Sequence, residues 1–337
     1  MSSAVVVYPL LPRFANGTGR RSPCAKPTCS ARARLVSSDT LTCRRRAARS
    51  TASARSSGSE MVVRLITSYI IPSPRRASAT IPGVARPSRE LAHVQRATER
   101  VLDTVRHLSD ADAQAPTRPP GWTRGHVLTH LARNADAQRR LLASAQTGQP
   151  VEQYPGGEAG RAAEIEAGAH RPAAELVEDL REAAAALAGG WEALPEQAWN
   201  RETVTLHGTR PVREGVLARW REVEVHHSDL GLGVTPADWT AEFVAVYLPR
   251  TVHGLPSRAR NRALRFRWQV HDRTTSSAWL VDARRARAGE GPADATVTGT
   301  NWQLLAWLLG RGAGGIEITG CTNLWLAWQL PRLFPFA

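Results

Sequence analysis

Apolar residues recur at three- and four-residue steps from Ser88 onward, and this spacing predicts amphipathic helices. Thr123 is placed to cap the second of them, and Pro172 stands at the start of the third. Four long helices are expected, over residues 88–108, 123–145, 172–194 and 213–229. A short helix and an extended excursion, TVTLHGTRPV at 203–212, fall between them. Helices of this kind, separated by loops, predict a four-helix bundle.

The pattern changes after GLGVTPAD at 231–238, which combines glycine, proline and a fresh helix start. A helix is expected over TAEFVAVYLPRTVHGL, and LRFRWQVHD then alternates strictly, with Leu264, Phe266, Trp268 and Val270 on one face. AWLVDA is expected to pair with it as a hairpin, and ATVTG and GIEITG are expected to be third and fourth strands around a helix at 301–311. The sequence therefore predicts an α+β protein: a helical bundle at 86–232 followed by a smaller mixed domain at 236–337.

The first quarter of the chain has a different composition. The whole chain of 337 residues carries a net charge of +14. Residues 1–88 hold fifteen Lys and Arg but only Asp39 and Glu60 as acids, so the remainder is nearly neutral. Residues 1–85 are rich in Arg and Ser and lack hydrophobic periodicity, which predicts a disordered basic segment. A composition rich in Arg and Ser and poor in acids is also typical of organellar transit peptides.

Charge and motifs exclude several classes of function. The folded part needs no nucleic-acid groove, because the basic excess lies in the first segment. MVVRLITSYIIP at 61–72 is too short to span a membrane and is interrupted by Arg64. Walker A and GxSxG motifs are absent. Cys321 is the lone cysteine of the body, so a disulfide framework is not available and a reducing cytoplasm is expected.

Two pairs of metal-ligand residues stand out. In HVLTH at 126–130, His126 and His130 are four residues apart, and in EVEVHH at 222–227, Glu222 and His226 are four apart. On a helix each pair shares one face. Two histidines and one carboxylate form a zinc ligand set that leaves a position open, and His130, Glu222 and His226 would supply it. A single HxxxH pair is also common among hydrogen-bonded structural histidines.

GWTRGHVLTHLARNADA at 121–137 and RWREVEVHHSDLG at 219–231 resemble the mycothiol-dependent maleylpyruvate isomerase family. The resemblance covers residues 86 to 320. It implies a mycothiol-making bacterium with no organelle to target, so residues 1–85 are interpreted as an over-extended reading frame with the natural start near Met61 or later. It implies a DinB-like four-helix bundle that binds zinc, followed by a sterol-carrier-like domain. Its zinc ligands fall on His130, Glu222 and His226, with His126 as the alternative first ligand.

The resemblance also implies a reaction. The thiolate of mycothiol would add to the cis double bond of maleylpyruvate, and its elimination after rotation would leave fumarylpyruvate. Arg311, at the end of the WLLGR helix, would hold a carboxylate of this dicarboxylate substrate, although an arginine at a helix C-terminus can equally serve the helix dipole. Asp229 would orient a histidine or cap the helix. His227 points to the neighbouring face, as a structural or solvent-facing residue.

Two other functions stay open. One is a different mycothiol- or thiol-dependent transferase on the same scaffold, because fold and metal do not fix the substrate. The other is a non-enzymatic metal-binding or metal-sensing protein. No nucleic-acid or membrane partner is expected, and the chain is expected to be a monomer or weak homodimer. The apolar tail at 321–337 departs from the family pattern.

Overall fold

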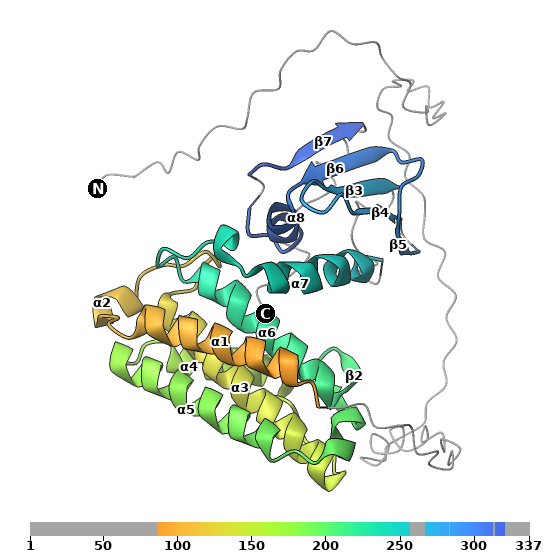
Figure 1. Cartoon of the computed structure of the whole chain (residues 1–337). Coiled ribbons are helices and arrows are strands. Elements are labelled where there is room, and N and C mark those ends of the chain that lie inside the picture. The colour runs from red at the N-terminus through yellow and green to blue at the C-terminus, as the bar shows by residue number, and fades with distance from the viewer. Residues whose placement is uncertain (1–85, 257–266, 283, 313, 321–337) are drawn as a thin grey trace, which may run out of the picture. The chain divides into compact units, whose positions relative to one another are not determined.

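The computed structural model describes residues 86–256, 267–282, 284–312 and 314–320. Its first part is helical and contains α1 (Ser88–Val105), α2 (Asp110–Ala113), α3 (Arg124–Thr147), α4 (Gly157–Gly168), α5 (Ala173–Glu192) and α6 (Val212–Asp229). The long helices α1, α3, α5 and α6 run side by side (Figure 1). The four-helix bundle expected from the apolar spacing is present.

Helix α3 is the central element of this bundle, and its ends follow from the sequence. The Thr123 side chain accepts a hydrogen bond from the backbone N–H of His126, which fixes the start of the helix. Gly148 ends it with φ = 73°, a left-handed conformation that glycine adopts without steric cost. Between these caps, Val127, Leu128 and Leu131 are buried. Because α3 contacts both α5 and α6, its polar side chains are enclosed as well.

A short 3₁₀ helix, η1 (Glu196–Asn200), and a two-stranded hairpin connect α5 to α6. Strand β1 (Glu202–Thr205) pairs antiparallel with β2 (Gly208–Pro211), and Thr205 lies opposite Gly208 at the turn. Gly208 has φ = 107°, which favours glycine there. The predicted extended excursion is therefore a hairpin, and α6 begins directly after it.

The second part of the chain mixes helices with a five-stranded sheet. It contains η2 (Pro236–Asp238), α7 (Ala241–Gly254), β3 (Trp268–Asp272), β4 (Ala278–Val281), β5 (Ala286–Ala288), β6 (Ala295–Gly299), α8 (Asn301–Leu308) and β7 (Glu317–Gly320). The strand order is β5-β4-β3-β6-β7, with β3 and β6 parallel and the other pairs antiparallel. The predicted α+β class is correct.

Two details of the sheet differ from expectation. Strand β5 was not predicted, because its three residues are too short to show a pattern, and ATVTG is therefore the fourth strand of the sheet in chain order. Strand β3 also departs from the strict alternation expected for LRFRWQVHD. Trp268 and the next residue, Gln269, are both buried, and the Gln269 side chain is hydrogen-bonded to the backbone of Gly289 and Gly291. Leu264, Phe266, Cys321 and the tail lie outside the described residues.

Aromatic side chains join α6 to α7. The ring of Trp220 lies 5.6 Å from that of Phe243, and the indole N–H of Trp239 donates to the carbonyl of Glu224 at 3.1 Å. These contacts bury the outer face of α6 and leave its other face toward α3. Among the described helices, none combines the length and the apolar character that crossing a membrane requires.

Candidate metal centre

Helices α3 and α6 bring three metal-ligand residues together. The Nε2 atom of His130 lies 3.1 Å from Oε2 of Glu222, and the Nε2 atom of His226 lies 3.4 Å from the same oxygen. One potential ligand atom from each residue lies within 4.8 Å of the others. The three residues that the sequence pattern selected as a zinc set therefore form one cluster.

Burial sets the protonation of this cluster. Burial lowers the pKa of His130 to about 3, so its imidazole is neutral near pH 7, the form that binds metals. Burial alone would raise the pKa of Glu222, but hydrogen bonds from His130 and His226 hold it well below its ordinary value. For His226, burial is outweighed by the adjacent carboxylates of Asp229 and Glu222, which raise its pKa. A metal would therefore displace a proton from His226.

A carboxylate supports His226 from behind. Oδ2 of Asp229 lies 2.9 Å from Nδ1 of His226, and the Asp229 side chain has no solvent exposure. This leaves Nε2 of His226 directed to Glu222. A carboxylate on the far nitrogen of a histidine is the usual support of a metal-binding imidazole, so His226 and Asp229 fit a metal site.

His130 is held differently. A guanidinium nitrogen of Arg161 lies 3.0 Å from its Nδ1. A guanidinium has only donors, so Nδ1 must accept and the proton must sit on Nε2, facing Glu222. Coordination through Nε2 would move that proton to Nδ1, and Arg161 would then have to turn away. The donor set fits a divalent metal, with this one rearrangement at Arg161.

Trp122 covers the cluster. Its ring centroid lies 6.2 Å from that of His126, 5.6 Å from that of His130 and 6.4 Å from that of His226. An indole against the imidazoles limits the access of water from that side and keeps the rings in place. The sequence reasoning did not select Trp122, although it stands directly before the Thr123 cap.

The other histidines near the cluster have different partners. His126 shares the α3 face with His130 but turns toward α4, where its Nε2 lies 3.2 Å from Oε2 of Glu166. Glu166 and His170 complete a second cluster, and both of their side chains are largely exposed. The structure therefore brings His130, and not His126, to Glu222 and His226.

His227 is buried rather than solvent-facing. Its Nε2 lies 2.8 Å from the hydroxyl of Thr104 on α1. Burial, followed by the charge of Arg100, lowers the pKa of His227 to about 4. Of the two interpretations given by the sequence, the structural one is correct, because α1 covers this face of α6.

Arg311 also lies close to the cluster, but its side chain points to a protein carboxylate. It is buried, and it donates to Asp229 through Nε at 3.2 Å and through an Nη at 2.7 Å. A further hydrogen bond joins an Nη of Arg311 to the carbonyl of Leu309 at 2.7 Å. Its role as a substrate ligand stays a prediction.

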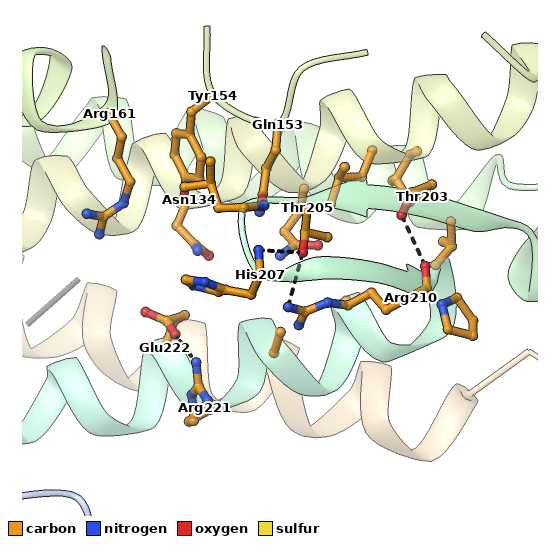
Figure 2. A pocket seen from close by; sticks show the side chains of 18 of the residues that line it. Asn134, Gln153, Tyr154, Arg161, Thr203, Thr205, His207, Arg210, Arg221 and Glu222 are labelled. Atoms are coloured by element: carbon orange, nitrogen blue, oxygen red, sulfur yellow. Dashed lines mark hydrogen bonds and ion pairs between the residues drawn. The ribbon is translucent and has the colours of Figure 1, made fainter. Parts of the chain in front are cut away.

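A pocket of about 330 Å³ opens beside His130 and Glu222. Its wall is formed by one face of α3, one face of α6, the start of α4 and the β1–β2 hairpin (Figure 2). On α6 the pocket is lined by two small residues, Gly215 and Ala218. A side chain at position 215 would clash with Gln138 on α3, because its Cβ would lie 2.5 Å from Oε1 of Gln138. The pocket gives a small molecule room next to the candidate metal ligands.

Several residues of this pocket were not found from the sequence. They are Asn134, Gln153, Tyr154, Arg161, Thr205, His207 and Arg210. They come from five separate segments with no common spacing, so only their meeting in the fold marks them. The face of α3 is the exception, because His130, Asn134 and Gln138 recur at four-residue steps.

The fold of this chain is similar to that of known proteins. A comparison with curated proteins gives no match. Two solved structures, a mycothiol-dependent maleylpyruvate isomerase and a histidine-to-alanine variant of it, each match with a TM-score of 0.61 at 24% identity, over 69% of this chain and 92% of theirs. Residues 94–231 match the family model described as the mycothiol maleylpyruvate isomerase N-terminal domain. The bundle that carries His130, Glu222 and His226 is therefore similar to the mycothiol maleylpyruvate isomerase N-terminal domain.

Proposed function

We propose that the protein is a zinc- and mycothiol-dependent isomerase that converts maleylpyruvate to fumarylpyruvate. The observation that carries this proposal is the cluster of His130, Glu222 and His226, which faces a pocket large enough for a small molecule. The family match over the same helices supports it. A buried donor set of two histidines and one carboxylate suits zinc and leaves a coordination position open.

The chain's own residues would hold the metal and exclude water. His130, Glu222 and His226 would bind it, Asp229 would keep the imidazole of His226 oriented, and Trp122 would cover the site. When bound, zinc would stabilise the thiolate of mycothiol, the form that adds reversibly to a conjugated cis double bond. After addition the former double bond is a single bond that can rotate, and elimination restores the alkene in its trans form.

Two measurements test the proposal. Metal analysis of the purified protein should find close to one zinc per chain. Maleylpyruvate should isomerise when mycothiol is present, and removing either zinc or mycothiol should abolish turnover. Zinc binding without turnover on any thiol would instead identify a metal-binding protein. Turnover of other electrophiles with mycothiol would identify a transferase on this scaffold.

A further inference from the structure

The pocket beside the metal cluster is lined by arginines from three different elements. Arg161 comes from α4, Arg210 from β2 and Arg221 from α6. Figure 2 shows Arg161 on the α4 side of the pocket opposite Glu222, and Arg210 reaching in from the hairpin beside Thr205. The acidic residues of the lining are Glu158 and Glu222. Since Glu222 faces the two histidines, the arginines dominate the charge of the remaining space.

These arginines differ in whether a protein carboxylate neutralises them. Arg221 pairs with Oε1 of Glu222 at 2.9 Å. Within the described residues, no carboxylate lies within ion-pair distance of Arg161 or Arg210. Arg161 contacts the neutral ring of His130 and the face of Tyr154, and Arg210 donates to the hydroxyl of Thr205 at 3.2 Å. Both guanidinium groups are half-buried with no carboxylate at ion-pair distance, and the charge of Glu214 only partly offsets that of Arg210. An anion in the pocket would neutralise them.

The positive charge of these arginines also affects the pKa of a neighbouring histidine. The pKa of His207, at the hairpin turn, is lowered first by burial and then by the charges of Arg210 and Arg221. Burial and the charge of Arg221 also lower the pKa of Arg210. The pocket therefore carries an excess of positive charge on the side away from Glu222.

Arg311 contrasts with these two arginines. Its planar fork is already satisfied by both oxygens of Asp229, and its backbone carbonyl accepts from Arg118 at 3.0 Å. A substrate carboxylate would have to displace Asp229 from a fully buried pair. Arg161 and Arg210 need no such exchange.

We propose that this pocket is an anion-binding site in which Arg161 and Arg210 bind the carboxylates of a dicarboxylate ligand. The inference rests on the proposed function in taking that ligand to be the isomerase substrate. Arginine suits the role because its fork matches a carboxylate with two parallel hydrogen bonds. Leu141, Leu142 and Leu206 line the same space and would contact the carbon chain between the carboxylates. Arg161 would also be freed for this role when His130 binds a metal through Nε2.

Calorimetric titration with maleate, a stable cis-dicarboxylate, tests the site without requiring turnover. The full-length, zinc-loaded chain should bind maleate more tightly than the monocarboxylate crotonate. Arg161→Gln and Arg210→Gln should each weaken maleate binding about tenfold or more, because each removes a charge-assisted contact. Arg139→Gln is the matched control, since Arg139 lies on α3 but pairs with Asp136 on an exposed surface. It should bind maleate as the unaltered chain does.

The outcomes separate this inference from the proposed function. Wild-type affinity for maleate in both Arg161→Gln and Arg210→Gln would overturn the inference, even if isomerase activity were present. No detectable maleate binding by the unaltered protein would also overturn it. Loss of maleate affinity in the two variants, in a protein without isomerase turnover, would support the anion site and reject the proposed function. Circular dichroism on every variant excludes unfolding as the cause.

Discussion

Arg311 donates two hydrogen bonds to the carboxylate of Asp229, one to each oxygen, and both side chains are buried. The same carboxylate lies 2.9 Å from the imidazole of His226. A residue beyond α8 is therefore joined to a metal-ligand candidate on α6 through one side chain. Through Asp229, Arg311 can therefore influence the candidate metal site without contacting a substrate.

Replacing Arg311 should therefore affect stability and metal content. Arg311→Ala leaves the Asp229 carboxylate buried without its cation, a loss of about 3–5 kcal/mol in the free energy of unfolding. Zinc affinity should also fall, since Asp229 would no longer be held against His226. Urea denaturation and zinc titration measure the two effects. The family resemblance predicts a different result, in which KM rises and zinc content is unchanged.

Asp229→Asn tests how much the carboxylate charge beside His226 contributes to zinc affinity. The amide keeps the shape of the side chain but removes the charge that stabilises the imidazole. Loss of such a support typically lowers metal affinity about 10–100-fold. Competition with a chelator of known affinity would determine the change, and an unaltered zinc affinity would show that Asp229 serves only its pairing with Arg311.

The ligand set itself predicts a pattern across four single substitutions. His130→Ala, Glu222→Ala and His226→Ala each leave two protein ligands, so each purified variant should carry much less zinc and lose isomerase activity. His227→Ala should keep zinc, because its imidazole contacts Thr104 instead. Metal analysis of each variant by mass spectrometry gives the comparison.

His126→Ala decides between the two histidines of HVLTH. It should keep zinc, because His126 faces Glu166 on α4. It should destabilise the protein by about 1 kcal/mol, since its side chain closes the capping box with Thr123. If His126→Ala lost the metal while His130→Ala retained it, the first ligand would be His126.

The free energy of unfolding of the metal-free protein should decrease as the pH is lowered. The pKa of His130 is about 3 and that of His227 about 4, both below the value of about 6.5 in an unfolded chain. The unfolded state therefore binds more protons, so the stability from these residues is complete above pH 6.5 and is lost toward pH 4 and pH 3. His226, whose pKa is raised, acts in the opposite direction.

Urea denaturation of the metal-stripped protein between pH 7 and pH 4.5 would measure this slope. Each histidine that stays neutral contributes about 1.4 kcal/mol per pH unit below pH 6. His227→Gln should reduce the change in the free energy of unfolding by about 1.4 kcal/mol per pH unit, the contribution of one histidine. An unaltered slope in that variant would show that His227 takes up its proton in the folded state.

The basic segment at the start of the chain should be dispensable. Its composition offers little apolar surface to offset the entropy of ordering. Deleting residues 1–85 should leave the melting temperature and the isomerase activity unchanged, as measured by calorimetry and by the maleylpyruvate assay. A clear loss in either quantity would assign this segment a role in folding or catalysis.

The parts of the fold and site that were predictable are those with a local signal. Thr123 caps α3 and Pro172 precedes α5 because their side chains act on adjacent backbone. The four-residue steps of His126–His130 and Glu222–His226 follow from helix geometry alone. The choice of His130 over His126 required the position of α4, which draws His126 toward Glu166.

The remaining site residues carry no local signal. Arg161 on α4 reaches His130 only because α4 packs on α3. Arg311 meets Asp229 across 82 residues of sequence. Strand β5 was missed because its register against β4, not its own side chains, defines it. Each of these relationships is tertiary, so composition and periodicity could not reveal them.

The candidate metal ligands and part of the pocket lining lie on different structural elements, because the hairpin between α5 and α6 supplies only pocket residues. The three metal-ligand residues are fixed by two core helices, whereas Thr205, His207 and Arg210 belong to two four-residue strands joined by a tight turn. The side chains of His207 and Arg210 are not buried, so exchanging them leaves the helix core unchanged, whereas Thr205 is buried. Changes confined to residues 202–211 could therefore alter which molecule the pocket binds while the candidate metal ligands stay the same, and the hairpin is the segment to randomise for that purpose.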